Sequence, residues 1–193
     1  YFQFLLERID WKRDLHFQTR TTMDTLDYSG TGLNQGSKVV MAAAGKPIRS
    51  LHTNLPENFR LPAGFSEPKW AMPGILAIQA PKFVEAQTAE QQANMLAETL
   101  ATVKNIEEVP LIVLCDDSAF TAHNLNNFLW TTFTRSNPSH DIYGVGSFID
   151  HKHWGCTGPL IIDARIKPHH APPLIEDPAI TQRIDALAAK GGP

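Results

Sequence analysis

The sequence predicts an α/β fold: a mostly parallel or mixed sheet with helices on its faces, plus an N-terminal arm rich in strands and loops. From Gly74 to Ile162, apolar runs and amphipathic stretches alternate as strand, helix, strand, helix, strand, the order of βαβ units. Before residue 55 no long amphipathic helix can be written. We therefore expect an arm, or a seam with another domain, over residues 1–54 and an α/β domain over residues 55–190.

The expected arm contains a strand and a Gly-rich loop. Leu15 to Met23 alternates loosely and is rich in Thr, which favours a strand. Asp27 to Gly36 follows as a Gly-rich loop before the short apolar run Val39 to Ala44. The glycine spacing matches neither common phosphate-binding motif. A second hypothesis is an assembly module without a catalytic role, in which the apolar residues 1–9 dock on a partner subunit.

The first half of the α/β domain begins with extended chain. Four prolines keep residues 56–73 extended or looped, because each one also restricts the residue before it. Gly74 to Gln79 is a candidate for a buried strand. A helix starts near Thr88, which forms a capping-box pattern with Gln91. Val109 to Cys115 is apolar throughout, as is typical of a strand covered on both faces.

The second half predicts one more long helix, two short strands and a terminal helix. Thr121 caps a helix that Asn137-Pro138 ends. Ile142 to Phe148 and Pro159 to Ile162 are short strand candidates, separated by a loop over 149–158. Asp177-Pro178 opens the last helix, and its apolar positions form one stripe. These positions are Ile180, Ile184, Leu187 and Ala188.

The composition and charge of the chain exclude some functional classes. The 193 residues have a net charge of −3 and a pI near 6.2, so no basic field is available for nucleic acid. The longest apolar runs, such as Leu111 to Cys115, are far shorter than the ~20 residues that span a bilayer. We expect a soluble, cytoplasmic protein with no integral membrane segment. The first residue is Tyr1 and not Met, which suggests part of a longer protein.

Two groups of residues are candidates for chemistry. His151, His153 and Cys156 carry metal-ligand atoms at close spacing; the favoured interpretation is a His-rich loop that lines a cleft or interface, with a metal site as the alternative. Asp116 and Asp117 follow a buried strand, where open α/β sheets bind ligands. We favour a structural role for both, since an aspartate after a strand commonly caps the next turn.

Several segments together resemble the C-terminal domain of the UbiD family of (de)carboxylases. The pattern is an acidic pair after a buried strand, then a Trp-containing helix, then a T-R-x-x-P-x-x-D sequence. Its parts are Leu55-Pro56-Glu57, Leu61-Pro62-Ala63-Gly64, Val113 to Asp117, Asn126 to Trp130, Thr134 to Asp141, Leu160 to Ala164, and Glu176-Asp177-Pro178. The first 54 residues match this pattern weakly.

The resemblance implies a lyase that decarboxylates aromatic or α,β-unsaturated acids without oxidation and uses prenylated FMN, as in quinone biosynthesis. In the family, the flavin, its divalent metal ion and the catalytic Glu and Arg residues belong to the preceding domain. We therefore expect no catalytic residue and no bound cofactor in this chain, which alone should be inactive. Its expected partners are the flavin-binding part of its own polypeptide and further copies, and its expected roles are oligomerisation and closure of the substrate pocket.

Within this chain, seven residues are candidates for the substrate pocket or for an interface. Phe148, His151, His153 and Trp154 are expected to form an apolar wall that accepts an aromatic ring. Arg165, Lys167 and His169 are expected to attract a carboxylate, or else to lie in a solvated turn or in a contact between subunits. The alternatives to the decarboxylase are a non-catalytic assembly module and a small His/Cys metal-binding protein. The identity of the substrate stays open.

Overall fold

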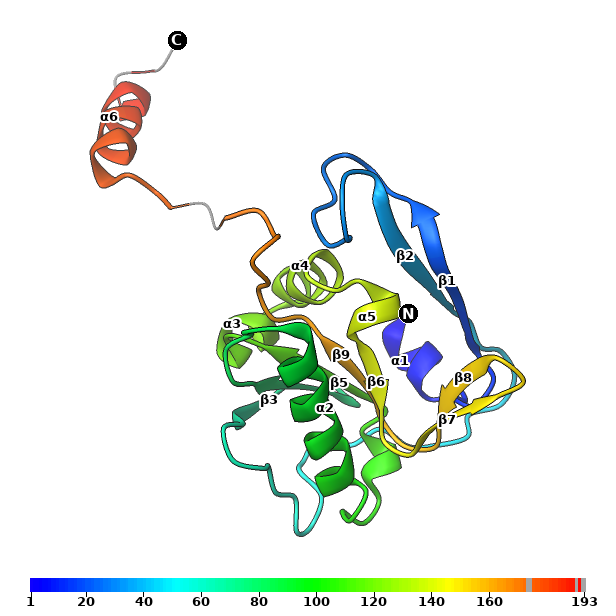
Figure 1. Ribbon diagram of the computed structural model, residues 1–193. Helices are drawn as coiled ribbons and strands as arrows, with labels where there is room; N and C mark the ends of the chain where they lie inside the picture. Colours follow the sequence, from blue (N-terminus) through cyan, green and yellow to red (C-terminus); the bar gives the residue numbers. More distant parts are fainter. Residues whose placement is uncertain (173–174, 190, 192–193) are drawn as a thin grey trace.

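A computed structural model describes residues 1–172, 175–189 and 191, and confirms the α/β class (Figure 1). Its centre is a five-stranded mixed sheet in the order β3-β4-β5-β9-β6. The three middle strands are parallel, and the outer strands pair antiparallel with them. The strands are β3 (Ser66–Met72), β4 (Ile75–Gln79), β5 (Leu111–Cys115), β9 (Leu160–Asp163) and β6 (Ile142–Gly144).

The middle strands are buried on both faces, as expected of parallel strands. One face of the sheet packs against α2 (Ala86–Leu100), whose Ala93, Leu96 and Leu100 are fully buried. The opposite face packs against the N-terminal segment and the Phe128 side chain. The continuous apolar run at β5 is thus explained by two hydrophobic layers, one on each side.

The N-terminal segment packs on the chain's own sheet. Residues 2–6 form a short helix, α1 (Phe2–Leu6), and Leu6, Ile9 and Trp11 are buried in the core beside the sheet. The indole N–H of Trp11 donates to the carbonyl of Pro110 at 2.9 Å. The hypothesis that residues 1–9 dock on a partner subunit is therefore wrong. Residues on both sides of position 54 share this core, and the division into domains there stays a prediction.

A two-stranded antiparallel ribbon follows and extends past α5 (Pro138–Asp141) in Figure 1. It consists of β1 (Leu15–Thr22) and β2 (Gln35–Met41), joined by the Gly-rich loop. The hydroxyl of Ser37 accepts from the backbone N–H of Ser139 at 2.8 Å, which ties the ribbon to α5. An isolated ribbon is marginal in water, so this attachment helps to hold it.

The long helix expected from Thr121 is two helices, α3 (Ser118–Ala122) and α4 (Leu125–Thr134). The break lies at Asn124, whose side chain accepts from the backbone N–H of Asn127 and caps α4. The Asn-Pro pair that we expected to end the helix also opens α5, because proline suits the first helical position. A 3₁₀ turn, η1 (Ile106–Glu108), precedes β5.

Two strands, β8 (His153–Cys156) and β3, lie in segments that the sequence predicts as a loop or as extended or looped chain. The segment 149–158 belongs largely to a hairpin of β7 (Ser147–Asp150) and β8, whose turn residues have positive φ. β3 contains Pro68, yet it lies at the edge of the sheet, where a missing N–H is tolerated. The prolines of residues 56–73 thus do not exclude a strand.

The last helix, α6 (Pro178–Ala189), lies apart from the rest of the structure in Figure 1. Asp177 caps it by accepting from the backbone N–H of Ala179. None of its residues is buried, so the predicted apolar stripe faces solvent. Residues 173, 174 and 190 of the expected domain lie outside the described residues. Within the described ranges, no helix has the length and apolarity needed to cross a membrane.

Candidate functional site

Two adjoining cavities make one cleft beside α5. The first, about 660 Å³, lies between β1, α5 and the β7–β8 hairpin. The second, about 680 Å³, lies between α2, the Gly-rich loop and the start of β6. Ser139, Ile142 and Trp154 line both. Trp154 therefore lies where the two cavities meet.

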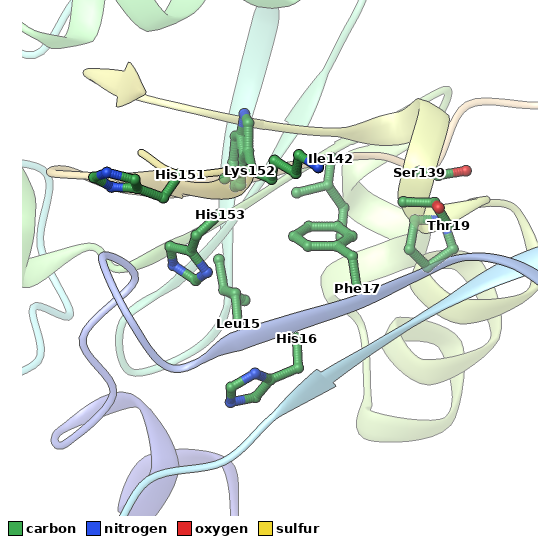
Figure 2. A pocket seen from close by; sticks show the side chains of 11 residues that line it. Leu15, His16, Phe17, Thr19, Ser139, Ile142, His151, Lys152 and His153 are labelled. Carbon is green, nitrogen blue, oxygen red and sulfur yellow. The ribbon is translucent and has the colours of Figure 1, made fainter. Parts of the chain in front are cut away.

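The first cavity combines an aromatic wall with a cationic side chain and histidines. The rings of Phe17 and Trp154 pack edge to face with centroids 5.7 Å apart. Figure 2 shows Leu15 and Phe17 on the side of β1 that faces the hairpin, with His16 on the other side. The hairpin turn adds the exposed residues His151 and Lys152 to the lining. An apolar ring beside positive charge suits an aromatic acid.

His153 is held in place by the N-terminal segment. Its Nε2 lies 2.9 Å from the carbonyl oxygen of Lys12, which requires a proton on that nitrogen for a hydrogen bond. The side chain of His151, by contrast, is 96% exposed. His153 thus fixes the hairpin against the loop after α1, whereas the exposed ring of His151 contacts the carboxylate of Asp150 through Nδ1, 2.5 Å away.

The second cavity is more polar. Glu90 of α2, His140 of α5, Tyr143 of β6 and the exposed His169 all line it, together with Ser29 and Thr31 from the Gly-rich loop. Burial raises the pKa of Tyr143, with smaller contributions from neighbouring carboxylates such as Asp163. Its hydroxyl therefore stays protonated at neutral pH and can donate a hydrogen bond into the cavity.

Arg165 does not face this cleft. The residue is fully buried, and its guanidinium binds the Asp163 carboxylate through Nε and Nη2 at 2.9 and 2.6 Å. Its Nη1 donates to the carbonyl of Pro81 and to Gln92. The expectation that Arg165 attracts a substrate carboxylate is wrong, because its donors already serve an internal carboxylate.

The ammonium group of Lys167 also binds oxygen atoms of the chain itself. Its ammonium donates to the carbonyl oxygens of Arg135 and Asp163 at 3.0 Å and of Arg165 at 3.3 Å, and lies 3.3 Å from the Asp141 carboxylate. Burial raises the pKa of Asp141 despite the opposing effect of Lys167. Lys167 lines the second cavity, yet four oxygens surround its charge. Of the expected basic trio, His169 alone is exposed.

His170 makes this region sensitive to pH. Burial, followed by the charge of Lys167, lowers the pKa of His170 from 6.5 to about 4, and His169 and Arg135 act in the same direction. Its Nδ1 accepts from the backbone N–H of Lys167 at 3.2 Å, a bond that protonation of Nδ1 would break. Since the unfolded chain binds this proton first, stability falls as pH drops from about 6.5 towards 4.

We expect acidification from pH 7 to pH 5 to destabilise the wild-type protein more than a His170→Asn variant, which retains an acceptor and does not titrate. Urea unfolding at several pH values measures the difference. Equal pH dependence in both proteins would show that folding does not lower the pKa of His170.

The expected apolar wall is partly assembled. His151, His153 and Trp154 line the first cavity, whereas Phe148 packs against Gly155 and lines neither cavity. Sequence reasoning missed Phe17, although its alternation with Leu15 in a strand marked it as facing inward. The contact of Phe17 with Trp154 of the hairpin depends on tertiary packing, and no local signal indicates it.

The alternative metal site does not form. Cys156 is buried against Gly144, and burial raises the pKa of its thiol to about 12, whereas His151 points into solvent. Within residues 1–172, 175–189 and 191, no three His, Cys, Asp or Glu residues are placed to hold a metal ion.

The two strand-end acids make structural contacts. Asp117 caps α3 by accepting from the backbone N–H of Phe120, and Asp116 accepts from the backbone N–H of Ile166 at 2.8 Å. Asp116 also pairs with Arg135 at 3.8 Å. Both carboxylates therefore bind the chain's own groups.

Comparison with known proteins identifies relatives. The family model of the 3-octaprenyl-4-hydroxybenzoate carboxy-lyase C-terminal domain, UbiD_C, matches residues 1–43. A Chlamydia pneumoniae protein, named as one subunit of a 4-hydroxybenzoate decarboxylase, is 32% identical over 181 residues, which cover 93% of this chain and 29% of that protein. The predicted resemblance to the UbiD family is confirmed.

Two further comparisons concern an uncharacterised protein and a solved structure. An uncharacterised protein of Chlamydia trachomatis is 33% identical over 182 residues, covering 93% of this chain and 29% of its own length. The open form of Sedimentibacter hydroxybenzoicus vanillic acid decarboxylase aligns over 61% of this chain and 27% of its own, at a TM-score of 0.39 and 17% identity; that similarity is too low to support an argument.

The UbiD match has an unexpected position. It covers residues 1–43, the segment for which the sequence analysis expects the weakest similarity, so that expectation is wrong. The chain spans less than a third of the length of the curated relatives that it matches. The matched residues include α1 and the ribbon, and Leu5, Leu6, Ile9, Trp11 and Leu15 among them are buried in the core described above.

Proposed function

We propose that this chain is the C-terminal part of a UbiD-like carboxy-lyase, which decarboxylates an aromatic or unsaturated acid without oxidation. The observation that carries the proposal is the similarity along 93% of the chain to a protein named as part of a 4-hydroxybenzoate decarboxylase. Because this chain spans 29% of that relative, the proposal assigns the catalytic residues to the remainder of a longer polypeptide.

The residues of this chain do not fit the family's cofactor. Prenylated FMN carries a phosphate and is held with a divalent metal, yet the described residues offer no metal-binding group. The buried cations Arg165 and Lys167 already bind Asp163 and Asp141. We therefore assign the flavin and its metal to the preceding part of the polypeptide and derive no chemical step through them.

The proposed role of this chain is to close the substrate side of the pocket. Phe17 and Trp154 offer an apolar surface for a ring, Lys152 offers positive charge for a carboxylate, and His151 lines the same cavity beside it. Both turn residues have positive φ, and asparagine is among the non-glycine residues that best tolerate this conformation. They can therefore be replaced with little strain.

The first test reads the gene upstream of the codon for Tyr1. A reading frame that extends into a flavin-binding domain supports the proposal, and its absence overturns it. The second test measures carbon dioxide release by the full polypeptide, loaded with prenylated FMN and a divalent metal, from a panel of aromatic acids. No release from any acid counts against the assignment.

We expect the His151→Asn, Lys152→Asn double variant of the full polypeptide to raise KM for an aromatic acid roughly tenfold with a smaller change in kcat. The two wild-type side chains, of which Lys152 carries the charge, would bind the carboxylate in ground and transition states alike. Lys104→Asn, an exposed lysine outside both cavities, is the matched control. An unchanged KM in the double variant would falsify the pocket role while leaving the decarboxylase assignment intact.

We also propose that the protein forms a homo-oligomer. The exposed apolar stripe of α6 supports this part of the proposal, because isolated apolar helix faces in water normally find a partner. The same observation favours the second candidate function, an assembly module without catalysis. Light scattering tests the oligomer, and the activity assay separates the two functions.

A further inference from the structure

A third cavity, an apolar groove of about 760 Å³, shares no lining residue with the cleft. It runs between the loop after β1, α4 and the segment that follows β9. Trp130, Phe133 and Tyr28 present exposed aromatic side chains to it, and Leu26 and Ile166 add exposed aliphatic ones. A concave and mainly apolar surface of this size is typical of a site for a small molecule.

Part of the aromatic wall of this groove is held in place by the core. The Phe133 ring packs edge to face on Phe128 and stacks on Phe2, with centroids 6.2 and 6.5 Å away. Phe128 itself is buried beside the sheet. Trp130 lies three residues before Phe133 on α4, so the two side chains are neighbours on the helix surface. An aromatic ligand therefore meets a wall that is formed before binding, which lowers the entropic cost of binding.

One polar group of the groove lining has no partner in the protein. The Nδ1 of His170 accepts from the backbone N–H of Lys167, and burial lowers the pKa of His170 to about 4. The ring is therefore neutral at pH 7 and carries its proton on Nε2. This Nε2–H is buried and has no hydrogen-bond partner among the described residues. A buried donor without an acceptor costs free energy, which an acceptor atom of a ligand would recover.

The charges around the groove disfavour an anion. Asp24 and Asp27 line it, and each carboxylate accepts from a backbone N–H of its own loop. Arg135 also lines the groove, but its guanidinium pairs with the Asp116 carboxylate at 3.8 Å. Two carboxylates beside a cation that is already paired repel an anionic ligand. A ligand that fits this lining is therefore neutral.

We infer that the groove binds a neutral aromatic small molecule with one carbonyl oxygen. Its rings pack on Trp130 and Phe133, and its oxygen accepts from the Nε2–H of His170. Because neighbouring atoms cover Nε2, binding requires a side chain to move. The exposed His169 ring, whose centroid lies 4.7 Å from that of His170, is such a neighbour, since exposed side chains change rotamer within nanoseconds. The inference depends on neither the proposed decarboxylase nor the proposed homo-oligomer.

Benzophenone and diphenylmethane test the inference, because they differ only in having a carbonyl group or a CH₂ group between two phenyl rings. Titration calorimetry on the full polypeptide should show saturable binding of benzophenone, with a Kd roughly tenfold lower than that of diphenylmethane. Ultraviolet light couples bound benzophenone to nearby C–H groups. Mass spectrometry of the irradiated complex should therefore find the label in peptides that contain residues 24–28 or 130–135.

Two variants separate the aromatic wall from the hydrogen bond. Trp130→Ala should weaken the binding of both probes roughly tenfold. Phe120→Ala, at an exposed residue of α3 outside the groove lining, is the matched control and should bind both probes as the wild-type protein does. His170→Phe retains a flat ring and removes the donor, so it should bind the two probes with equal Kd. Circular dichroism checks that each variant folds.

Four results would overturn the inference. They are no saturable binding of benzophenone, which would mean that protein covers the groove; equal Kd values for the two probes in the wild-type protein; label confined to peptides outside the groove; and tighter, Trp130-dependent binding of the anion 4-benzoylbenzoate than of benzophenone. The comparison of probes on the wild-type protein decides the role of the donor even if His170→Phe does not fold. Decarboxylase activity and oligomeric state enter none of these measurements.

Discussion

Asp163→Ala is expected to lower the free energy of unfolding by about 3–5 kcal/mol, because it leaves a buried guanidinium without its carboxylate. Asp163 and Arg165 are both fully buried and bind each other through two nitrogen–oxygen pairs. The same carboxylate also accepts from the backbone N–H of Arg165. Urea unfolding, with the slope checked for constancy, measures the loss.

The double variant Asp163→Leu, Arg165→Met tests whether the loss comes from the unpaired charge. Replacing both members of a buried ion pair with apolar groups is often close to neutral. It should recover much of the lost stability. Asp150→Ala removes an exposed carboxylate from β7 and should cost less than about 0.5 kcal/mol. A loss below about 1 kcal/mol in Asp163→Ala would mean that water reaches the guanidinium.

Trp11→Ala is expected to cost about 3–5 kcal/mol, the range for removing a large aromatic side chain from a core. Trp11 is 3% exposed, packs against the face of the sheet opposite α2, and donates its indole N–H to Pro110. Thermal or urea unfolding measures the effect. Trp11→Phe retains most of the apolar surface and should lose less, which separates packing from the hydrogen bond.

Trp130 supplies the matched control for this experiment, since it is 61% exposed. Trp130→Ala should change the stability of the monomeric protein by no more than about 0.5 kcal/mol. If Trp11→Ala proved equally mild, the N-terminal segment would be only loosely attached to the sheet.

The sheet is the most predictable part of the fold. The sequence of β5 is apolar throughout because helices and loops cover both faces of the strand. α2 can be predicted from the sequence because its apolar residues recur on one face of the helix. In both cases the local pattern of hydrophobicity records the burial that the structure shows.

Other parts depend on contacts that no local pattern reveals. α1 has five residues, fewer than two helical turns, so its apolar pattern does not repeat. Packing on a distant sheet stabilises it. The hairpin turn at His151 and Lys152 uses positive φ at residues that rarely mark such turns. The sequence therefore predicts an arm and a loop in place of these elements.

The candidate site shows the same limit. The cluster of His151, His153 and Trp154 can be found from their closeness in sequence. Arg165 and Lys167 look equally available, because a sequence does not show that Asp163 and Asp141 meet them inside the fold. Only the tertiary structure shows whether a cationic side chain is paired with a carboxylate inside the protein or is available to a ligand.

The burial of the N-terminal segment also has a consequence for how the chain folds. Leu6, Ile9 and Trp11 pack against β5 and β9, which begin at residues 111 and 160. During synthesis the N-terminal segment emerges long before these partner strands. The apolar side chains of the segment therefore stay exposed until about 150 further residues, up to β9, have been added. Closing so long a loop is slow, so we expect attachment of the N-terminal segment to be a late step of folding.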